Sequence, residues 1–146
     1  MTEQTKTTEP TFVLTRSIHA PQETVWASLL QMVEGAGQGG GYHREGDPAP
    51  LGVGSVLLLD LAGSQMREVV TDYDAPNLRR YAIVAGAPVD GYEATIELST
   101  AEAGTDVVWS VWGTAHNDAG REFMSFAEKF LSGAIDMLDQ LSTDAG

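Results

Sequence analysis

The chain has 146 residues and a mass of 15.6 kDa, which is enough to bury a core as a single domain without disulfides or a structural metal. Its 8 Lys and Arg residues against 21 Asp and Glu residues give a formal net charge of -13, which repels phosphate backbones and disfavours nucleic acid as a partner. Because the chain has no cysteine, disulfides, thiolate nucleophiles and cysteine-ligated metal clusters are excluded.

The N-terminal segment is polar. Residues 1–10 are rich in Thr and Glu and offer almost no apolar surface, so they predict a flexible tail before the first element. No apolar run approaches the roughly 18–20 residues of a membrane-spanning helix, and the start lacks the apolar stretch of a signal peptide. We therefore expect a cytoplasmic protein that does not insert into membranes.

The first elements are a strand and a helix. Residues 11–19 are rich in β-branched side chains and predict a strand, and Pro21 and Glu23 then mark the start of a helix. Apolar residues follow at helical spacing as far as Val33. The five glycines of 35–41 predict that this helix ends at Gly35 and that an irregular loop follows.

The middle of the chain alternates short apolar runs with turns. The runs predict strands at 54–61, 66–73, 78–85, 92–99 and 105–114, and turns separate them at 74–77 and 103–104. Consecutive strands at hairpin spacing form an antiparallel sheet.

The last segment returns to helical periodicity. From Ala119 onward, one apolar stripe is predicted to face the core. Its members are Phe123, Phe126, Ala127, Phe130, Leu131, Ala134, Met137, Leu138 and Leu141. A helix of about 22 residues spans roughly 33 Å, so its apolar face has to pack against a surface as long as a small domain. A curved sheet wrapped around this helix gives an α+β fold.

Four segments of this pattern resemble a known superfamily. They are SIHAPQETVW at 17–26, GVGSV at 52–56, REVV at 67–70 before DAP at 74–76, and GTDVVW at 104–109. Together with the long final helix they resemble the START-like or Bet v 1-like helix-grip proteins (SRPBCC), and among these the small bacterial polyketide cyclase/dehydrase-type members. The resemblance implies a single ligand-binding domain over 11–142, with six or seven antiparallel strands around the helix.

The resemblance also implies an internal cavity for a hydrophobic or aromatic molecule. Its expected volume is a few hundred Å³, within the range of roughly 300–1,000 Å³ for ligand pockets. The glycine loop at 35–41 is then expected to lie at the cavity entrance and to act as a lid.

Three residues are candidates for acid/base catalysis: Glu68, His43 and Tyr92. Arg67 and Glu68 are adjacent on a strand and must face opposite sides of the sheet, and the alternation of the strand leaves open which of them faces inward. The resemblance favours Glu68, which in an apolar pocket could act as a general acid or base. The alternative is that Glu68 pairs with an arginine or lies in solvent.

The other candidates are expected to contact the ligand. His43 lies between Tyr42 and Arg44 beside the glycine loop, so these two neighbours are predicted at the cavity mouth. Trp109 shares a strand face with apolar residues and is expected in the core or the cavity wall. The remaining candidates come from the final helix and are Phe123, Phe126 and Phe130.

No metal or cofactor is predicted. His19, His43 and His116 show none of the spacings that metal sites use. The GxGxxG match at 35–40 follows a helix and precedes a strand, which is the reverse of the order that dinucleotide binding requires.

The functional hypothesis is binding of a small hydrophobic, polyketide-like molecule by a monomer or homodimer, with catalysis of a non-redox cyclisation or dehydration left open. The alternatives are a non-catalytic carrier or sensor of a hydrophobic molecule or lipid, and a chaperone-associated module that acts through its acidic surface. Trp112, predicted on the outer sheet face, is a candidate dimer contact.

Overall fold

The computed structural model describes residues 9–40, 42–61 and 63–145. In chain order the elements are β1 (Phe12–Ile18), α1 (Gln22–Gly40), β2 (Tyr42–Arg44), β3 (Val56–Leu61), β4 (Ser64–Asp74), β5 (Leu78–Ala85), β6 (Asp90–Ala101), β7 (Gly104–Thr114) and α2 (Asp118–Ala145). Of the tail predicted at 1–10, residues 1–8 lie outside the described part. The predicted strands and both helices are present, and the short β2 is an addition.

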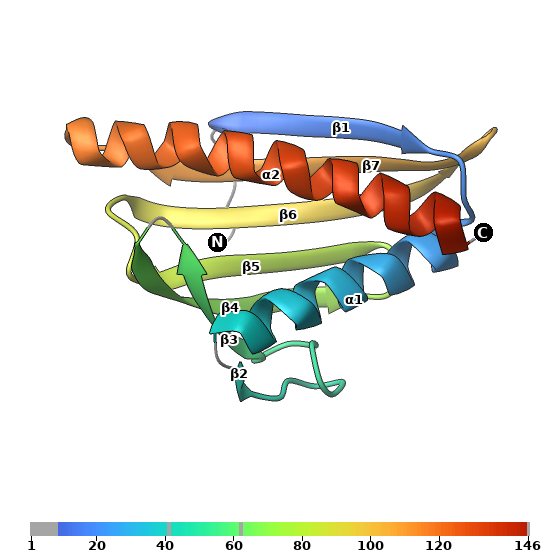
Figure 1. Cartoon of the computed structure of the whole chain (residues 1–146), viewed down its shortest axis with the longest axis horizontal. Helices are drawn as coiled ribbons and strands as arrows, with labels where there is room; N and C mark the ends of the chain where they lie inside the picture. Colours follow the sequence, from blue (N-terminus) through green and yellow to red (C-terminus); the bar gives the residue numbers. More distant parts are fainter. Residues whose placement is uncertain (1–8, 41, 62, 146) are drawn as a thin grey trace.

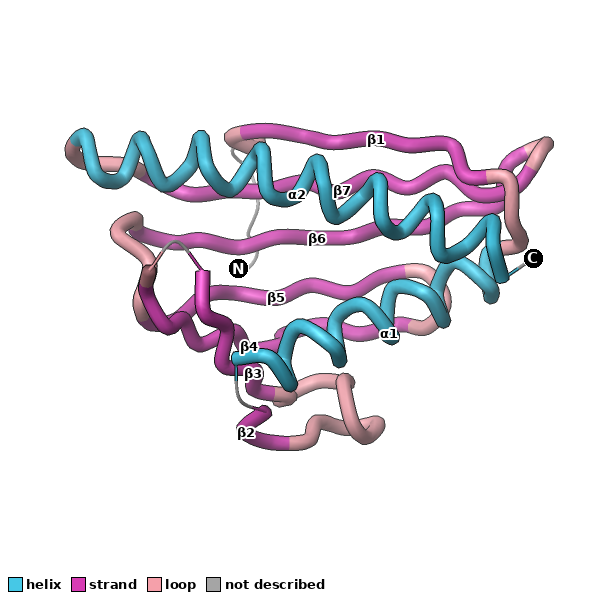
Figure 2. Tube along the Cα trace, viewed as in Figure 1, coloured by secondary structure: helices cyan, strands magenta, loops and turns pink. Residues whose placement is uncertain are grey.

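The strands form one antiparallel sheet of seven, in the order β1-β7-β6-β5-β4-β3-β2. Both helices lie on the same side of this curved sheet, with α2 running along β1 and β7 and α1 below it toward β3 (Figure 1). The same arrangement is seen in the Cα trace (Figure 2). The α+β helix-grip fold implied by the resemblance is therefore confirmed.

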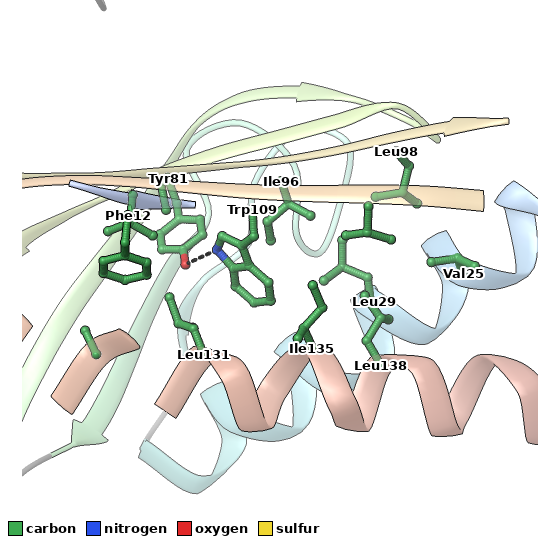
Figure 3. Close-up of a cluster of buried hydrophobic side chains, with 14 of the residues drawn as sticks. Phe12, Val25, Leu29, Tyr81, Ile96, Leu98, Trp109, Leu131, Ile135 and Leu138 are labelled. Atoms are coloured by element: carbon green, nitrogen blue, oxygen red, sulfur yellow. Dashed lines mark hydrogen bonds between the residues drawn. The ribbon is translucent and has the colours of Figure 1, made fainter. Parts of the chain in front are cut away.

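The strand register selects the side chains that face the helices. On β5, Arg79 and Tyr81 are buried on the inner face, and Tyr81 lies opposite Ala94 of β6. On β6 and β7, Ile96 lies opposite Trp109. With Leu138 and other α2 residues, the side chains of Tyr81, Ile96 and Trp109 form the apolar core between sheet and helix (Figure 3).

Helix α1 continues through the glycines. The predicted loop and lid at 35–41 are wrong for residues 35–40, which belong to α1, and residue 41 lies outside the described part. A glycine costs about 1 kcal/mol in a helix relative to alanine, which weakens the helix without forbidding it. The first turns are anchored by the buried Val25, Trp26 and Leu29, and each further residue adds a hydrogen bond to an existing helix.

The buried face of α2 is narrower than predicted. Phe123, Ala127, Leu131 and Leu138 are buried as expected, together with the unpredicted Met124 and Ile135. Three members of the predicted stripe are exposed instead: Phe126 to 37%, Phe130 to 44% and Met137 to 54%. Successive residues turn a helix by about 100°, so these three side chains lie on the flank of the stripe and not at its centre.

Candidate functional site

A small cavity lies between α2 and the inner face of strands β3 to β6. Its volume is about 60 Å³. Its walls are Leu59, Glu68, Tyr81, Ile83, Tyr92, Phe123, Phe126, Ala127, Phe130 and Leu131. The expected volume of a few hundred Å³ is wrong for this conformation, because bulky side chains from the helix and the sheet occupy the space.

Two phenylalanines of α2 form the exposed edge of the cavity. Phe126 and Phe130 stack with their ring centroids 5.9 Å apart and their planes 23° from parallel. Both rings line the cavity and both are partly open to solvent. A molecule larger than the present cavity therefore has to displace these two side chains, which are less tightly held than the buried residues behind them.

Glu68 and Arg79 form a buried ion pair at the sheet side of the cavity. Arg79 Nη2 donates to Glu68 Oε2 at 3.1 Å, and the exposed fractions of the two residues are 1% and 6%. The Arg79 guanidinium lies 5.2 Å from the centroid of the Tyr81 ring, a cation–π distance. Within the described part of the chain, Arg79 Nε has no hydrogen-bond partner.

This geometry answers two questions that the sequence left open. Glu68 faces inward and Arg67 outward, as the resemblance favoured. The alternative of an arginine partner also holds, since Glu68 lines the cavity while paired with Arg79.

Tyr81 is held by a tryptophan from β7. Trp109 Nε1 donates to the Tyr81 hydroxyl oxygen at 3.2 Å (Figure 3). Burial raises the pKa of Tyr81 well above its ordinary value, and the nearby Tyr92 and Glu68 add to this. The Tyr81 hydroxyl therefore keeps its proton. Trp109 supports Tyr81 from behind and is not itself part of the cavity wall.

Tyr92 brings a second phenol to the cavity from β6. Its ring meets Phe123 edge to face, with centroids 5.9 Å apart. Burial raises the pKa of Tyr92 above its ordinary value, and the charge of Glu68 contributes to the same shift. Tyr92 is thus a hydrogen-bond donor next to a carboxylate.

Two of the predicted mouth residues lie elsewhere. His43 and Arg44 belong to β2 at the edge of the sheet, are exposed, and do not line the cavity. Arg44 donates from Nε and Nη2 to the carbonyl oxygen of Gly54, at 3.3 and 3.2 Å, which stabilises the neighbouring loop. The prediction followed from the glycine loop that proved to be helical. The side chain of Tyr42 is outside the described part.

The structure thus brings Glu68, Tyr92, Phe123, Phe126 and Phe130 together. Sequence reasoning missed Arg79, Tyr81, Leu59 and Ile83. A signal for three of these was present, because the alternation of 78–85 places Arg79, Tyr81 and Ile83 on one strand face.

A wider groove at the start of α1 is a different kind of feature. The groove has a volume of about 400 Å³ and is open to solvent. It is lined by polar residues such as Gln22, Asn77 and Thr100. The Gln22 side-chain amide donates to the Pro76 carbonyl at 2.9 Å and accepts from Thr100 Oγ1 at 2.8 Å. These bonds tie α1 to the sheet, so we assign the groove a structural role.

Among the residues that the structure describes, no cluster of three or more His, Asp or Glu side chains is placed to hold a metal ion. In the same part of the chain, no helix is long and apolar enough to span a membrane.

The fold and its inner cavity define a helix-grip protein. Residues 9–144 match the model of the family described as "Polyketide cyclase / dehydrase and lipid transport", so the chain belongs to this family. The resemblance seen in the sequence is thereby confirmed.

Solved structures share the fold at low sequence identity. The protein MLL2253 from Mesorhizobium loti has a TM-score of 0.69 and 16% identity, with 92% of this chain and 98% of that chain covered. Ara h 8.0201 has a TM-score of 0.70 and 16% identity, with 91% and 97% covered. The Aha1 dimer from Colwellia psychrerythraea has a TM-score of 0.62 and 17% identity, with 87% and 94% covered. A search of curated proteins found no match.

Proposed function

We propose that this protein binds a small hydrophobic or aromatic molecule between α2 and the sheet, as one ligand-binding domain over residues 11–142 in the cytoplasm. The observation that carries the proposal is a cavity with apolar walls, a buried carboxylate and two phenols on its sheet side, and two partly exposed phenylalanines at its edge. Membership of a family named for polyketide cyclases and lipid transport supports the same class of ligand.

Catalysis of a non-redox cyclisation or dehydration is a second candidate. It is favoured by the position of Glu68 and Tyr92 in the cavity wall, where a carboxylate and a protonated phenol could move protons on a bound molecule. His43 drops out of this candidate set because its exposed side chain lies on β2. A carrier or sensor would use the same cavity without turnover, and the Arg79 partner of Glu68 is consistent with that role.

Binding is tested with N-phenyl-1-naphthylamine, a neutral fluorophore whose emission rises in apolar surroundings. We expect saturable binding with a stoichiometry of one. Ala127 lines the cavity, so Ala127→Leu adds bulk inside it and should weaken binding by about tenfold or more.

The matched control is Ala134→Leu, which adds the same atoms on the same helix at a partly buried position outside the cavity wall. It should bind the fluorophore like the unmodified protein, provided that thermal melting shows both variants folded. Absence of saturable binding, or equal binding by the two folded variants, would contradict the proposed cavity.

A further inference from the structure

The sheet side of the cavity presents an unused hydrogen-bond acceptor. Glu68 accepts from Arg79 through Oε2, and its other oxygen, Oε1, accepts no hydrogen bond from the described residues. The negative charge of Glu68 offsets the positive charge of Arg79 within this buried ion pair. Oε1 is therefore an acceptor that can take a hydrogen bond from a bound molecule.

Only the negatively charged member of this ion pair lines the cavity. Glu68 lines the cavity, whereas Arg79 is not part of its wall and lies over the Tyr81 ring. The pair is neutral as a whole, but its negative end meets the ligand space. In surroundings of low polarity, a second carboxylate placed there is repelled and loses its hydration without compensation.

The two phenols supply hydrogen-bond donors at the same place. Tyr81 uses its oxygen to accept from Trp109 and keeps its own hydrogen available, and Tyr92 adds a second hydroxyl to the cavity wall. Both tyrosines and Glu68 line the one cavity, and the remaining wall is aliphatic or aromatic. A ligand group that both donates and accepts a hydrogen bond fits this constellation.

We infer that the cavity selects neutral aromatic molecules that carry a hydroxyl group and discriminates against molecules that carry a carboxylate. The hydroxyl donates to Glu68 Oε1 and accepts from Tyr92 or Tyr81, while the ring system lies against the apolar wall. This specificity rests on the proposed function, since it concerns the same cavity. It favours phenol-like ligands over fatty-acid anions within the broad class of hydrophobic molecules.

The test compares three probes that share one ring system: 2-naphthol, naphthalene and naphthalene-2-carboxylate, each displacing N-phenyl-1-naphthylamine at pH 7. Relative to naphthalene, we expect 2-naphthol to bind about tenfold tighter or more, because a hydrogen bond to a charged group forms. We expect naphthalene-2-carboxylate to bind weaker than naphthalene by about tenfold or more, because its charged group loses hydration beside Glu68.

Glu68→Gln tests the origin of the discrimination. Removing the negative charge should leave Arg79 uncompensated, so the carboxylate should gain affinity relative to naphthalene while 2-naphthol loses part of its advantage. The double variant Glu68→Gln/Arg79→Met removes both charges and should bind all three probes within about threefold of each other. Glu97→Gln, on an exposed position of β6, is the control and should keep the order of the unmodified protein.

The binding of the probes to the unmodified protein distinguishes a failure of the specificity from a failure of the proposed function. If naphthalene displaces the fluorophore but 2-naphthol binds no tighter, or the carboxylate binds as well as naphthalene, the inferred specificity is wrong and the proposed function stands. If neither the fluorophore nor any of the three probes binds, the proposed function fails and the specificity fails with it. The order 2-naphthol, naphthalene, carboxylate supports both.

Discussion

Arg79 is the residue on which the polar side of the cavity depends. Its side chain runs along β5 past the Tyr81 ring and reaches Glu68 on the neighbouring strand. A buried carboxylate without this partner would keep its desolvation penalty and lose the attraction that offsets it. The position of Glu68 in the wall therefore requires Arg79, although Arg79 itself does not line the cavity.

Arg79→Met should destabilise the protein by about 3–5 kcal/mol, the usual cost of leaving one member of a buried pair alone. Adding Glu68→Gln to this variant should recover a substantial part of the loss, because no unpaired charge then remains. Urea unfolding of the single and double variants measures both effects.

Arg80→Met is the matched control. Arg80 is the next residue on β5 and pairs with Asp72 at 3.0 Å near the surface, where such a pair contributes about 0–1 kcal/mol. Equal losses in the free energy of unfolding for Arg79→Met and Arg80→Met would show that the buried pair contributes no more stability than the exposed pair.

The sequence could indicate only part of this site. Strand alternation places Tyr92 on the apolar face of β6, and the resemblance favours Glu68 inward. The partnership with Arg79 could not be deduced, because it depends on the register of β4 and β5. Glu68 lies opposite Ile83, and Arg79 lies opposite Tyr73 several residues away, so the long arginine side chain has to bridge the offset.

At the scale of elements, helical periodicity predicted both helices, but the predicted end of α1 at Gly35 and part of the predicted buried face of α2 were wrong. The glycines of 35–40 argue against a helix, yet the chain is helical there because the preceding turns are already packed against the sheet. The exposure of Phe126 and Phe130 depends on the rotation of α2 about its axis, which the packing of Leu131 and Ile135 against the sheet determines. Periodicity gives the width of an apolar face only approximately.

Gly35→Ala should stabilise the protein by about 0.5–1 kcal/mol, because alanine is the better helix former. A methyl group at Gly35 would meet no atom within 4 Å apart from its chain neighbours and the backbone of its own helical turn. Chemical denaturation should therefore show a higher midpoint with an unchanged slope.

Gly86→Ala provides the contrast. Gly86 has a φ angle of 98°, and a Cβ atom there would clash with the carbonyl oxygen of Gln65. This variant should lose more than about 1 kcal/mol, because alanine at such a φ angle is strained. A loss of stability in Gly35→Ala would mean that the end of α1 is not helical in solution.

For the whole molecule, the order of elements together with the resemblance was sufficient to predict the fold. The size of the cavity was not predictable, because it is the small difference between the space under the sheet and the volume of the side chains that fill it. A rotation of Phe126 or Phe130 changes that difference without changing any strand or helix. Fold and ligand capacity are thus determined at different scales, which is why one fold serves many functions.

The net charge of the molecule leads to the last prediction. The chain has a formal charge of -13, and folding brings these charges of the same sign closer together than they are in the unfolded chain. Raising NaCl from about 10 mM to about 150 mM shortens the screening length from about 30 Å to about 8 Å, which should relieve this repulsion. We expect the Tm to rise by about 2–4 °C, the shift that corresponds to about 1 kcal/mol in a protein of this size.

Screening also weakens the favourable ion pairs, such as that of Arg16 Nη1 with Asp139 Oδ2 at 3.0 Å, which links β1 to α2. Partly exposed pairs of this kind contribute at most about 1 kcal/mol each, so the repulsion among many acidic groups should dominate. Choline chloride at the same ionic strength separates screening from specific sodium binding, because it should raise the Tm equally. A Tm that falls with either salt would show that the local pairs outweigh the net charge.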